Sequence, residues 1–170
     1  MTKEFIKNKG MKYPDTDMYN YIIAQFAERG VYLSDIAEIA RDSQKRFFPD
    51  LGEDECMEAL TDILHKREVM NIIAVGLVID RDATQGTLPQ PMQAIVENDL
   101  PVEGADEWLA IGISLNFGSV STSNWGFQDV VKHGVIKDID EATDHVNTFL
   151  DDIIGALAAC VEAKVAHARA

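Results

Sequence analysis

The sequence lacks a long apolar run, and this absence argues against a membrane-spanning helix. A helix that crosses a bilayer needs about 20 mostly apolar residues, whereas the longest apolar segments, 69–79 and 153–161, are much shorter and end in charged residues. The N-terminal segment MTKEFIKNKGMKYPD is polar and has no apolar core of the kind found in a signal peptide. We therefore expect a cytoplasmic protein with at most peripheral membrane contact.

Cysteine is scarce, and the motifs of several enzyme classes are missing. The two cysteines, Cys56 and Cys160, have neither metal-ligand nor redox spacing. No serine, cysteine or histidine lies in a nucleophile motif, and no glycine-rich phosphate loop is present. The sequence thus gives no support for a serine or cysteine hydrolase, or for a P-loop nucleotide-binding protein.

Basic residues are also scarce. The 170 residues include 15 Lys and Arg but 29 Asp and Glu, which gives a net charge of −14. The first 50 residues carry equal numbers of both signs, so the whole acidic excess lies beyond residue 50. This charge argues against nucleic-acid binding, which needs positive charge to neutralise phosphates, but it is compatible with cation binding. Most of these carboxylates are expected to form an ordinary solvated surface.

Apolar residues recur with helical spacing along most of the chain, and no segment alternates convincingly as a strand would. The length and a hydrophobic content of 46% favour one packed domain over residues 1–170, with 1–15 as a loosely packed N-terminal segment. We predict an all-α fold, a compact bundle of about six helices. The predicted helices span 17–29, 35–47, 54–82, 89–98, 104–117 and 148–168, and residues 118–144 are predicted to be a long connection with at most a short helix.

The predicted helix 148–168 is apolar around most of its circumference, yet Asp151 and Asp152 lie at its start. Thr148 and Asp151 fit a capping box, which gives Asp151 a structural explanation. Capping does not explain Asp152. At about 100° per residue, both carboxylates head a face made of small residues, where a neighbouring helix can approach closely. We therefore expect them to lie in a crevice between helices.

A second acidic start precedes the predicted helix 104–117. Glu103, Asp106 and Glu107 share one face of its first turn. Taken alone, this pattern is an ordinary acidic helix start that complements the helix dipole. Two such starts, each leading into an apolar helix, suggest more than capping. Carboxylates from two helices together supply the oxygen ligands that Mg²⁺ needs.

Positive charge lies near the start of the apolar half of the predicted helix 54–82. Arg67 and Asn71 are one turn apart there. A guanidinium group can bind two oxygens of a phosphate, and it can equally form an ion pair with acidic residues, so both interpretations stay open. His145 precedes the aspartate pair by six residues and can reach the same crevice.

Four blocks of the sequence resemble the phosphatidylglycerophosphatase A family, in its soluble, low-temperature-requirement C-like branch. The blocks are KREVMNIIAVGL, PMQAIVENDLPVEGADEWLAIGISLNFGS, SNWGFQDVVKHGVIKDID and HVNTFLDDIIGALAACVEAKVAH. The resemblance implies one central helix surrounded by the others, and Mg²⁺-dependent hydrolysis of the phosphate monoester of phosphatidylglycerol phosphate. The residues to which it points are Asp106, Glu107, Asp129, Lys132, Asp151 and Asp152. His133 stands where the family usually has proline.

The sequence therefore predicts a Mg²⁺-dependent phosphatase. The predicted catalytic residues and metal ligands are Asp106, Glu107, Asp151 and Asp152. The predicted substrate-binding residues are Arg67, Asn71, Asp129 and Lys132. We also expect a homo-oligomer, because apolar helices of small bundles often pair.

Three alternatives stay open. An anionic bilayer would repel a chain with a charge of −14, so the substrate of a phosphatase of this kind can also be a soluble phosphate ester. A second alternative is a non-catalytic helical protein that retains an acidic pocket for a cation or a small ligand. In the third, the acidic residues are helix caps in a purely structural bundle.

Overall fold

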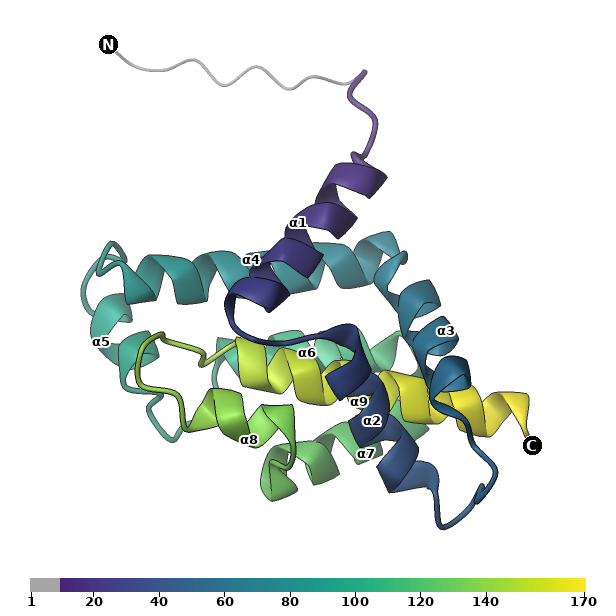
Figure 1. The fold of residues 1–170 in the computed structure, drawn as a ribbon. Coiled ribbons are helices and arrows are strands. Elements are labelled where there is room, and N and C mark those ends of the chain that lie inside the picture. The colour runs from purple at the N-terminus through teal and green to yellow at the C-terminus, as the bar shows by residue number, and fades with distance from the viewer. Residues whose placement is uncertain (1–9) are drawn as a thin grey trace.

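The computed structural model describes residues 10–170, and within this range the chain forms nine α-helices and no β-strand (Figure 1). The helices are α1 (Asp15–Glu28), α2 (Leu33–Gln44), α3 (Glu53–Leu64), α4 (Arg67–Thr84), α5 (Met92–Glu97), α6 (Ala105–Leu115), α7 (Gly118–Val131), α8 (Val135–Asp140) and α9 (Leu150–Ala168). The predicted all-α class is thus confirmed. None of these helices combines the length and the apolar character needed to cross a membrane. The prediction of a loosely packed segment 1–15 falls largely on residues 1–9, which lie outside the described residues.

Helix α9 is enclosed by other helices. It contacts α2, α3, α4, α6, α7 and α8, and in Figure 1 it runs between α4 on one side and α7 on the other. Every residue from position 150 to 163 is buried. A helix that is apolar on all sides is stable only where neighbours cover the whole of it. The composition of α9 therefore explains its position.

The structure divides the predicted helix 54–82 into two helices. α3 ends at Leu64 and α4 begins at Arg67, and Lys66 between them has an extended backbone with φ −80° and ψ 119°. No glycine or proline marks this break in the sequence. α3 packs on α2, whereas α4 packs on α1, α5 and α6. One straight helix cannot contact both sets of neighbours, so tertiary packing breaks it.

The predicted connection 118–144 contains two helices, α7 and α8, so residues 10–170 hold nine helices where the sequence predicts about six. The buried residues of α7 are Ser121, Trp125 and Gln128, which lie on one face against α9. Two of these three are polar, so the apolar period that identifies an amphipathic helix is missing from the sequence. Contact with α9 therefore stabilises a helix that composition alone does not predict.

Replacing Leu157 by alanine tests how much the enclosure of α9 contributes to stability. Leu157 is fully buried, and Leu→Ala substitutions in protein cores lower the free energy of unfolding by about 2–5 kcal/mol. Leu115 on α6 is 63% exposed, so Leu115→Ala should change this free energy by less than about 0.5 kcal/mol. Urea unfolding followed by circular dichroism gives both values. Equal losses in the two variants would contradict the enclosure of α9.

Candidate functional site

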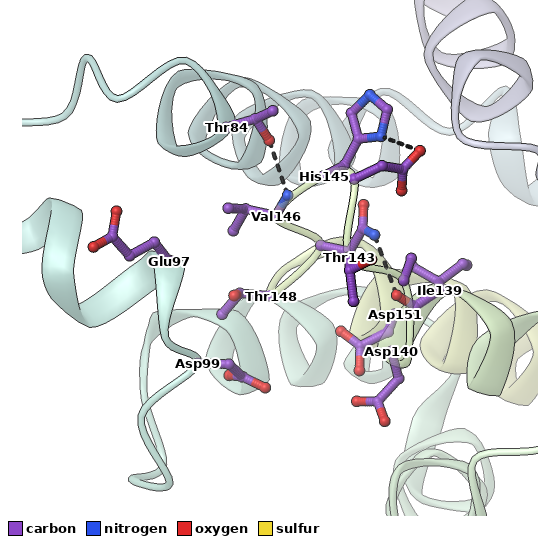
Figure 2. A pocket seen from close by; sticks show the side chains of 13 residues that line it. Thr84, Glu97, Asp99, Ile139, Asp140, Thr143, His145, Val146, Thr148 and Asp151 are labelled. Atoms are coloured by element: carbon purple, nitrogen blue, oxygen red, sulfur yellow. Dashed lines mark hydrogen bonds and ion pairs between the residues drawn. The ribbon is translucent and has the colours of Figure 1, made fainter.

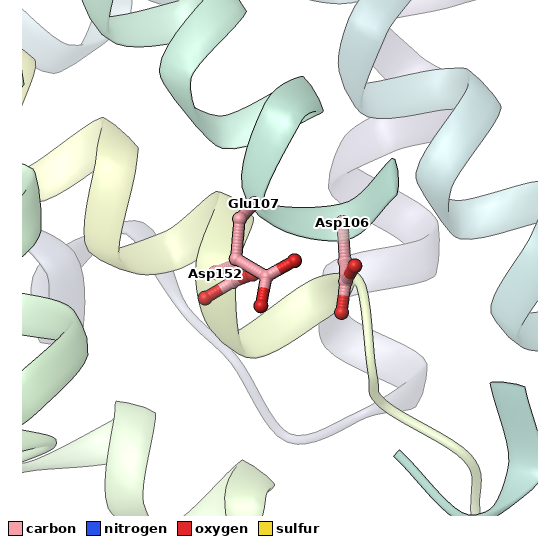
Figure 3. A group of neighbouring side chains, drawn as sticks. All are labelled: Asp106, Glu107 and Asp152. Atoms are coloured by element: carbon pink, nitrogen blue, oxygen red, sulfur yellow. The ribbon is translucent and has the colours of Figure 1, made fainter. Parts of the chain in front are cut away.

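Three carboxylates meet where the start of α6 lies beside the start of α9 (Figure 3). Asp106 and Glu107 belong to the first turn of α6, and Asp152 belongs to the first turn of α9. One oxygen of each carboxylate lies within 4.8 Å of the corresponding oxygens of the other two. The structure thus brings together three of the four acidic residues that the sequence predicts as metal ligands. We call this set the three-carboxylate cluster.

Asp152 is the most deeply buried member of the three-carboxylate cluster. Asp152 is only 6% exposed. No donor within residues 10–170 forms a hydrogen bond to its carboxylate. Burial raises the pKa of Asp152 to about 9, and the negative charges of Asp151 and Asp129 contribute to the rise. A buried carboxylate without a donor is costly. Asp152 is therefore poised to hold either a proton or a cation at neutral pH.

Asp106 and Glu107 shift each other's pKa in opposite directions. Burial raises the pKa of Asp106 to about 7, and its hydrogen bond to Glu107 is the second cause. Burial also disfavours ionisation of Glu107, but the hydrogen bonds from Asp106 and from the Gly104 amide outweigh it and lower the pKa of Glu107. The Gly104 N–H donates to Glu107 Oε2 over 2.6 Å. Of the two, Asp106 therefore holds a proton more readily, and Glu107 ionises more readily.

Asp151 has a different partner from its neighbour Asp152. The Lys132 ammonium donates to Asp151 Oδ2 over 2.7 Å and to Asp140 Oδ1 over 2.6 Å. Burial disfavours this ammonium, but the two carboxylates outweigh burial and raise the pKa of Lys132. Burial raises the pKa of Asp151 to about 6, and the ammonium opposes the rise. At neutral pH the pair is therefore ionised, and Asp151 is held in place by Lys132.

The N-terminus of α9 is capped by Asp80 of α4. Asp80 is completely buried, and its carboxylate accepts hydrogen bonds from the amides of Phe149 and Leu150. Burial raises the pKa of Asp80 to about 8, and these two amides oppose the rise. The predicted capping box of Thr148 and Asp151 is therefore wrong. No side chain of the helix caps it, and the Thr148 hydroxyl donates to a backbone carbonyl of α5 instead.

A pocket of about 370 Å³ opens beside Asp151 (Figure 2). Its lining is largely polar and includes Thr84, Asp99, Asp140, Thr143, Asn147 and Asp151. Both carboxylates that bind Lys132 line this pocket. The pocket can therefore receive a polar group beside Asp140 and Asp151, the two carboxylates that bind Lys132.

Two of the other predicted residues lie close to these acidic groups. Asp129 is on α7, and its charge is one of those that raise the pKa of Asp152. It does not belong to the three-carboxylate cluster. His145 lines the pocket, and its Nδ1 lies 3.1 Å from Asp144 Oδ2.

Arg67 and Asn71 lie elsewhere. The Arg67 guanidinium donates two hydrogen bonds of 2.7 and 2.8 Å to Asp15, and Asn71 accepts a hydrogen bond from the Tyr13 hydroxyl over 3.0 Å. Arg67 begins α4 and Asp80 lies near its other end, about 20 Å away along the helix axis at 1.5 Å per residue. The structure therefore does not bring Arg67 and Asn71 to the acidic groups of α6 and α9.

Sequence reasoning missed two acidic residues of this region, Asp80 and Asp140. Asp80 directly follows the apolar segment 69–79, so its position in the sequence indicates that it is buried. Its partner Leu150, however, is 70 residues away, and no local pattern predicts such a contact. Asp140 lies eight residues after Lys132 in a segment that the sequence predicts to be a connection.

The donor set of the three-carboxylate cluster fits a hard divalent cation. Its ligand atoms are all carboxylate oxygens, which Mg²⁺ prefers over nitrogen and sulfur. A cation would also relieve the repulsion between the three carboxylates. Gly104 leaves room for this arrangement, because a Cβ atom there would lie 2.6 Å from Asp106 Oδ1.

Comparison with known proteins identifies one family and several relatives. Residues 23–167 match the family model of phosphatidylglycerophosphatase A. The chain is 39% identical to the protein YpjQ of Bacillus subtilis (strain 168), over 92% of this chain and 88% of YpjQ. It is 42% identical to YutG of the same organism, over 85% of this chain and 87% of YutG. The crystal structure of the low temperature requirement C protein from Listeria monocytogenes is similar with a TM-score of 0.86 and 37% identity, over 89% of this chain and 96% of that chain.

Removing the carboxylate of Asp152 should stabilise the metal-free protein at high pH. The folded-state pKa values of Asp152, Asp80 and Asp106 are about 9, 8 and 7, above the unfolded value of about 4. The folded state therefore binds more protons than the unfolded state, and stability falls as pH rises from about 4 to 9. In EDTA, Asp152→Asn should have a higher free energy of unfolding than the wild type at pH 8 and a similar one at pH 5. Urea titrations at pH 5 and pH 8 measure these free energies of unfolding. A wild type as stable as the variant at pH 8 would contradict the raised pKa of Asp152.

Proposed function

Because the chain belongs to the phosphatidylglycerophosphatase A family, we propose that it is a Mg²⁺-dependent phosphatase that hydrolyses a phosphate monoester at the three-carboxylate cluster. The resemblance of the four sequence blocks is confirmed by the family match, and membership of this family implies a phosphatase. One observation supports the metal dependence: three carboxylates from two helices converge, and one of them is buried without a hydrogen-bond donor from residues 10–170.

In this proposal Asp106, Glu107 and Asp152 hold Mg²⁺. When bound there, the ion supplies positive charge that stabilises the charge developing on the phosphoryl group. Asp106 and Asp152 must first release the protons that burial favours at neutral pH. Asp129, whose charge already acts on Asp152, supplies a further carboxylate beside the three-carboxylate cluster.

Lys132 supplies the positive charge of the protein itself. An ammonium has three N–H donors, and two of them bind Asp140 and Asp151. The third donor remains for an oxygen of the phosphate, and the side chain is part-exposed, at 27%. Because two carboxylates fix the ammonium, little side-chain entropy is lost when it binds the phosphate. We therefore propose that Lys132 orients the phosphate.

The polar pocket beside Asp151 is our proposed site for the alcohol side of the ester. Asp99 and Asp140 line it and can accept hydrogen bonds from hydroxyl groups. The family name implies phosphatidylglycerol phosphate as the substrate. In this lipid the phosphate is attached to a glycerol, which carries a hydroxyl group of the kind that the pocket can bind.

The same polar lining favours a second candidate, a water-soluble phosphate ester of a polyol. The net charge of −14 supports it, because an anionic bilayer repels an acidic protein. The two candidates use the same acidic residues and differ only in whether the alcohol carries a lipid.

Phosphate release with and without Mg²⁺ tests the proposed reaction. The wild type should release phosphate only with Mg²⁺, and Asp152→Asn should lower kcat/KM by about 100-fold or more, because a ligand to the ion is lost. Asp54→Asn, the same change at an exposed position in the first turn of α3, should leave the rate unchanged. Full turnover by Asp152→Asn would end the assignment.

The substrates for this assay are vesicles containing phosphatidylglycerol phosphate and, in parallel, soluble glycerol 3-phosphate. Turnover of only one of them selects between the two candidates. Turnover of neither, in the presence of Mg²⁺, would favour the non-catalytic alternative.

Mg²⁺ should stabilise the protein more at pH 8 than at pH 5. At pH 5 protons occupy Asp106 and Asp152, whose pKa values are about 7 and 9, and they compete with the ion. At pH 8 fewer protons remain, so binding is tighter and the rise in melting temperature is larger. Thermal unfolding with and without 10 mM MgCl₂ measures the shift at each pH. Equal shifts at both pH values would mean that the ion binds elsewhere.

A further inference from the structure

The chain just before α9 is held by residues from other helices. Asp80 of α4 accepts hydrogen bonds from the Phe149 amide over 3.1 and 3.2 Å and from the Leu150 amide over 2.9 Å. Thr84, one turn later on α4, accepts a hydrogen bond from the Val146 amide over 2.9 Å. Arg29, at the end of α1, donates to the Val146 carbonyl over 3.0 Å. The position of the first turn of α9 is therefore fixed from outside the helix.

This arrangement leaves the acidic residues of α9 free for other roles. The first amides of a helix need acceptors, and an acidic residue of the first turn or the N-cap usually supplies one. Here Asp80 supplies it. Asp151 can therefore bind Lys132, and Asp152 can point toward Asp106 and Glu107 (Figure 3).

Close packing between α4 and α9 strengthens this constraint. A Cβ atom on Gly76 would lie 2.6 Å from Ile153 Cδ1 and 3.1 Å from Phe149 Cβ. α4 therefore touches the residues on both sides of the aspartate pair. With Asp80 one turn further along α4, the start of α9 has little freedom to slide or rotate.

We propose that Asp80 is a positioning residue for the metal site: without contacting the ion, it fixes the first turn of α9 so that Asp152 reaches the carboxylates of α6. This inference rests on the proposed function, since it assumes that the three-carboxylate cluster binds Mg²⁺. Groups that orient metal ligands without touching the metal typically change its affinity by about 10- to 100-fold when they are altered.

The experiment is isothermal titration calorimetry, in which Mg²⁺ is titrated into the metal-free protein. Asp80→Asn keeps the shape and one oxygen acceptor but replaces the other oxygen with an NH₂ group, which cannot accept a hydrogen bond from an amide. It should weaken Mg²⁺ binding by about 10-fold or more. Circular dichroism at the titration temperature verifies that each variant is folded.

Two further variants separate positioning from other effects. Val161→Ala removes buried side-chain atoms from α9, far along the helix from Asp152, and should lower stability with no change in Mg²⁺ affinity. Gly76→Ala changes no charge but pushes against Phe149 and Ile153, and should weaken Mg²⁺ binding in the same direction as Asp80→Asn.

Each outcome decides the proposal. Weaker binding in Asp80→Asn and Gly76→Ala, with normal binding in Val161→Ala, supports it. Wild-type affinity in Asp80→Asn overturns it, as does an equal loss in Val161→Ala, which would reflect general stability. Normal binding in Gly76→Ala beside a loss in Asp80→Asn also overturns it, because a property of Asp80 other than its hold on α9 would then determine the affinity. A wild type that binds no Mg²⁺ removes the proposed function together with this inference, whereas the other outcomes leave the proposed function intact.

Discussion

Asp151 and Asp152 are consecutive carboxylates on a buried helix, where each raises the free energy of ionising the other and both resist removal from water. The surrounding structure treats the two differently. Lys132 at the end of α7 neutralises Asp151. Asp152 lies near Asp106, Glu107 and Asp129, and no positive group among residues 10–170 pairs with it. A cation that binds Asp152 would therefore relieve the repulsion between it and the neighbouring carboxylates. The other helices around the start of α9 can be understood as the means of keeping these two environments apart.

Each of these neighbours comes from a different part of the chain. α4 supplies Asp80 and the close contact at Gly76, α6 supplies Asp106 and Glu107, and α7 supplies Lys132 and Asp129. Small residues on α9 allow such crowding, because a Cβ atom on Gly155 would already be in van der Waals contact with Gln128 of α7. The acidic site is thus a product of the helix packing and not of one local motif.

The sequence predicts those parts of the site that depend on local pattern. An apolar helix headed by acidic residues is visible in LDDIIGALAACV and in ADEWLAIGI, and the structure joins three of the four acids so identified. The sequence does not predict α7, because its buried face consists of Ser121, Trp125 and Gln128, which carry no apolar period. It also does not predict the cap of α9. A capping box is a contact within one turn, whereas Asp80 reaches α9 across 70 residues of chain, and only the folded packing determines such a pair.

The enclosure of α9 also determines which parts of the acidic site can move. Amides of a helix that is covered on every side exchange their hydrogens with water only when the neighbouring helices separate, so their opening free energy approaches that of global unfolding. Asp151 and Asp152 belong to such a segment, since residues 150–163 are all buried. α6 differs, because Trp108 and Leu115 expose 61% and 63% of their surface. α7 also exposes large side chains, Phe127 at 55% and Val130 at 81%. The residues that α6 and α7 contribute to the site therefore have more freedom to adjust to a bound group than Asp151 and Asp152 of α9.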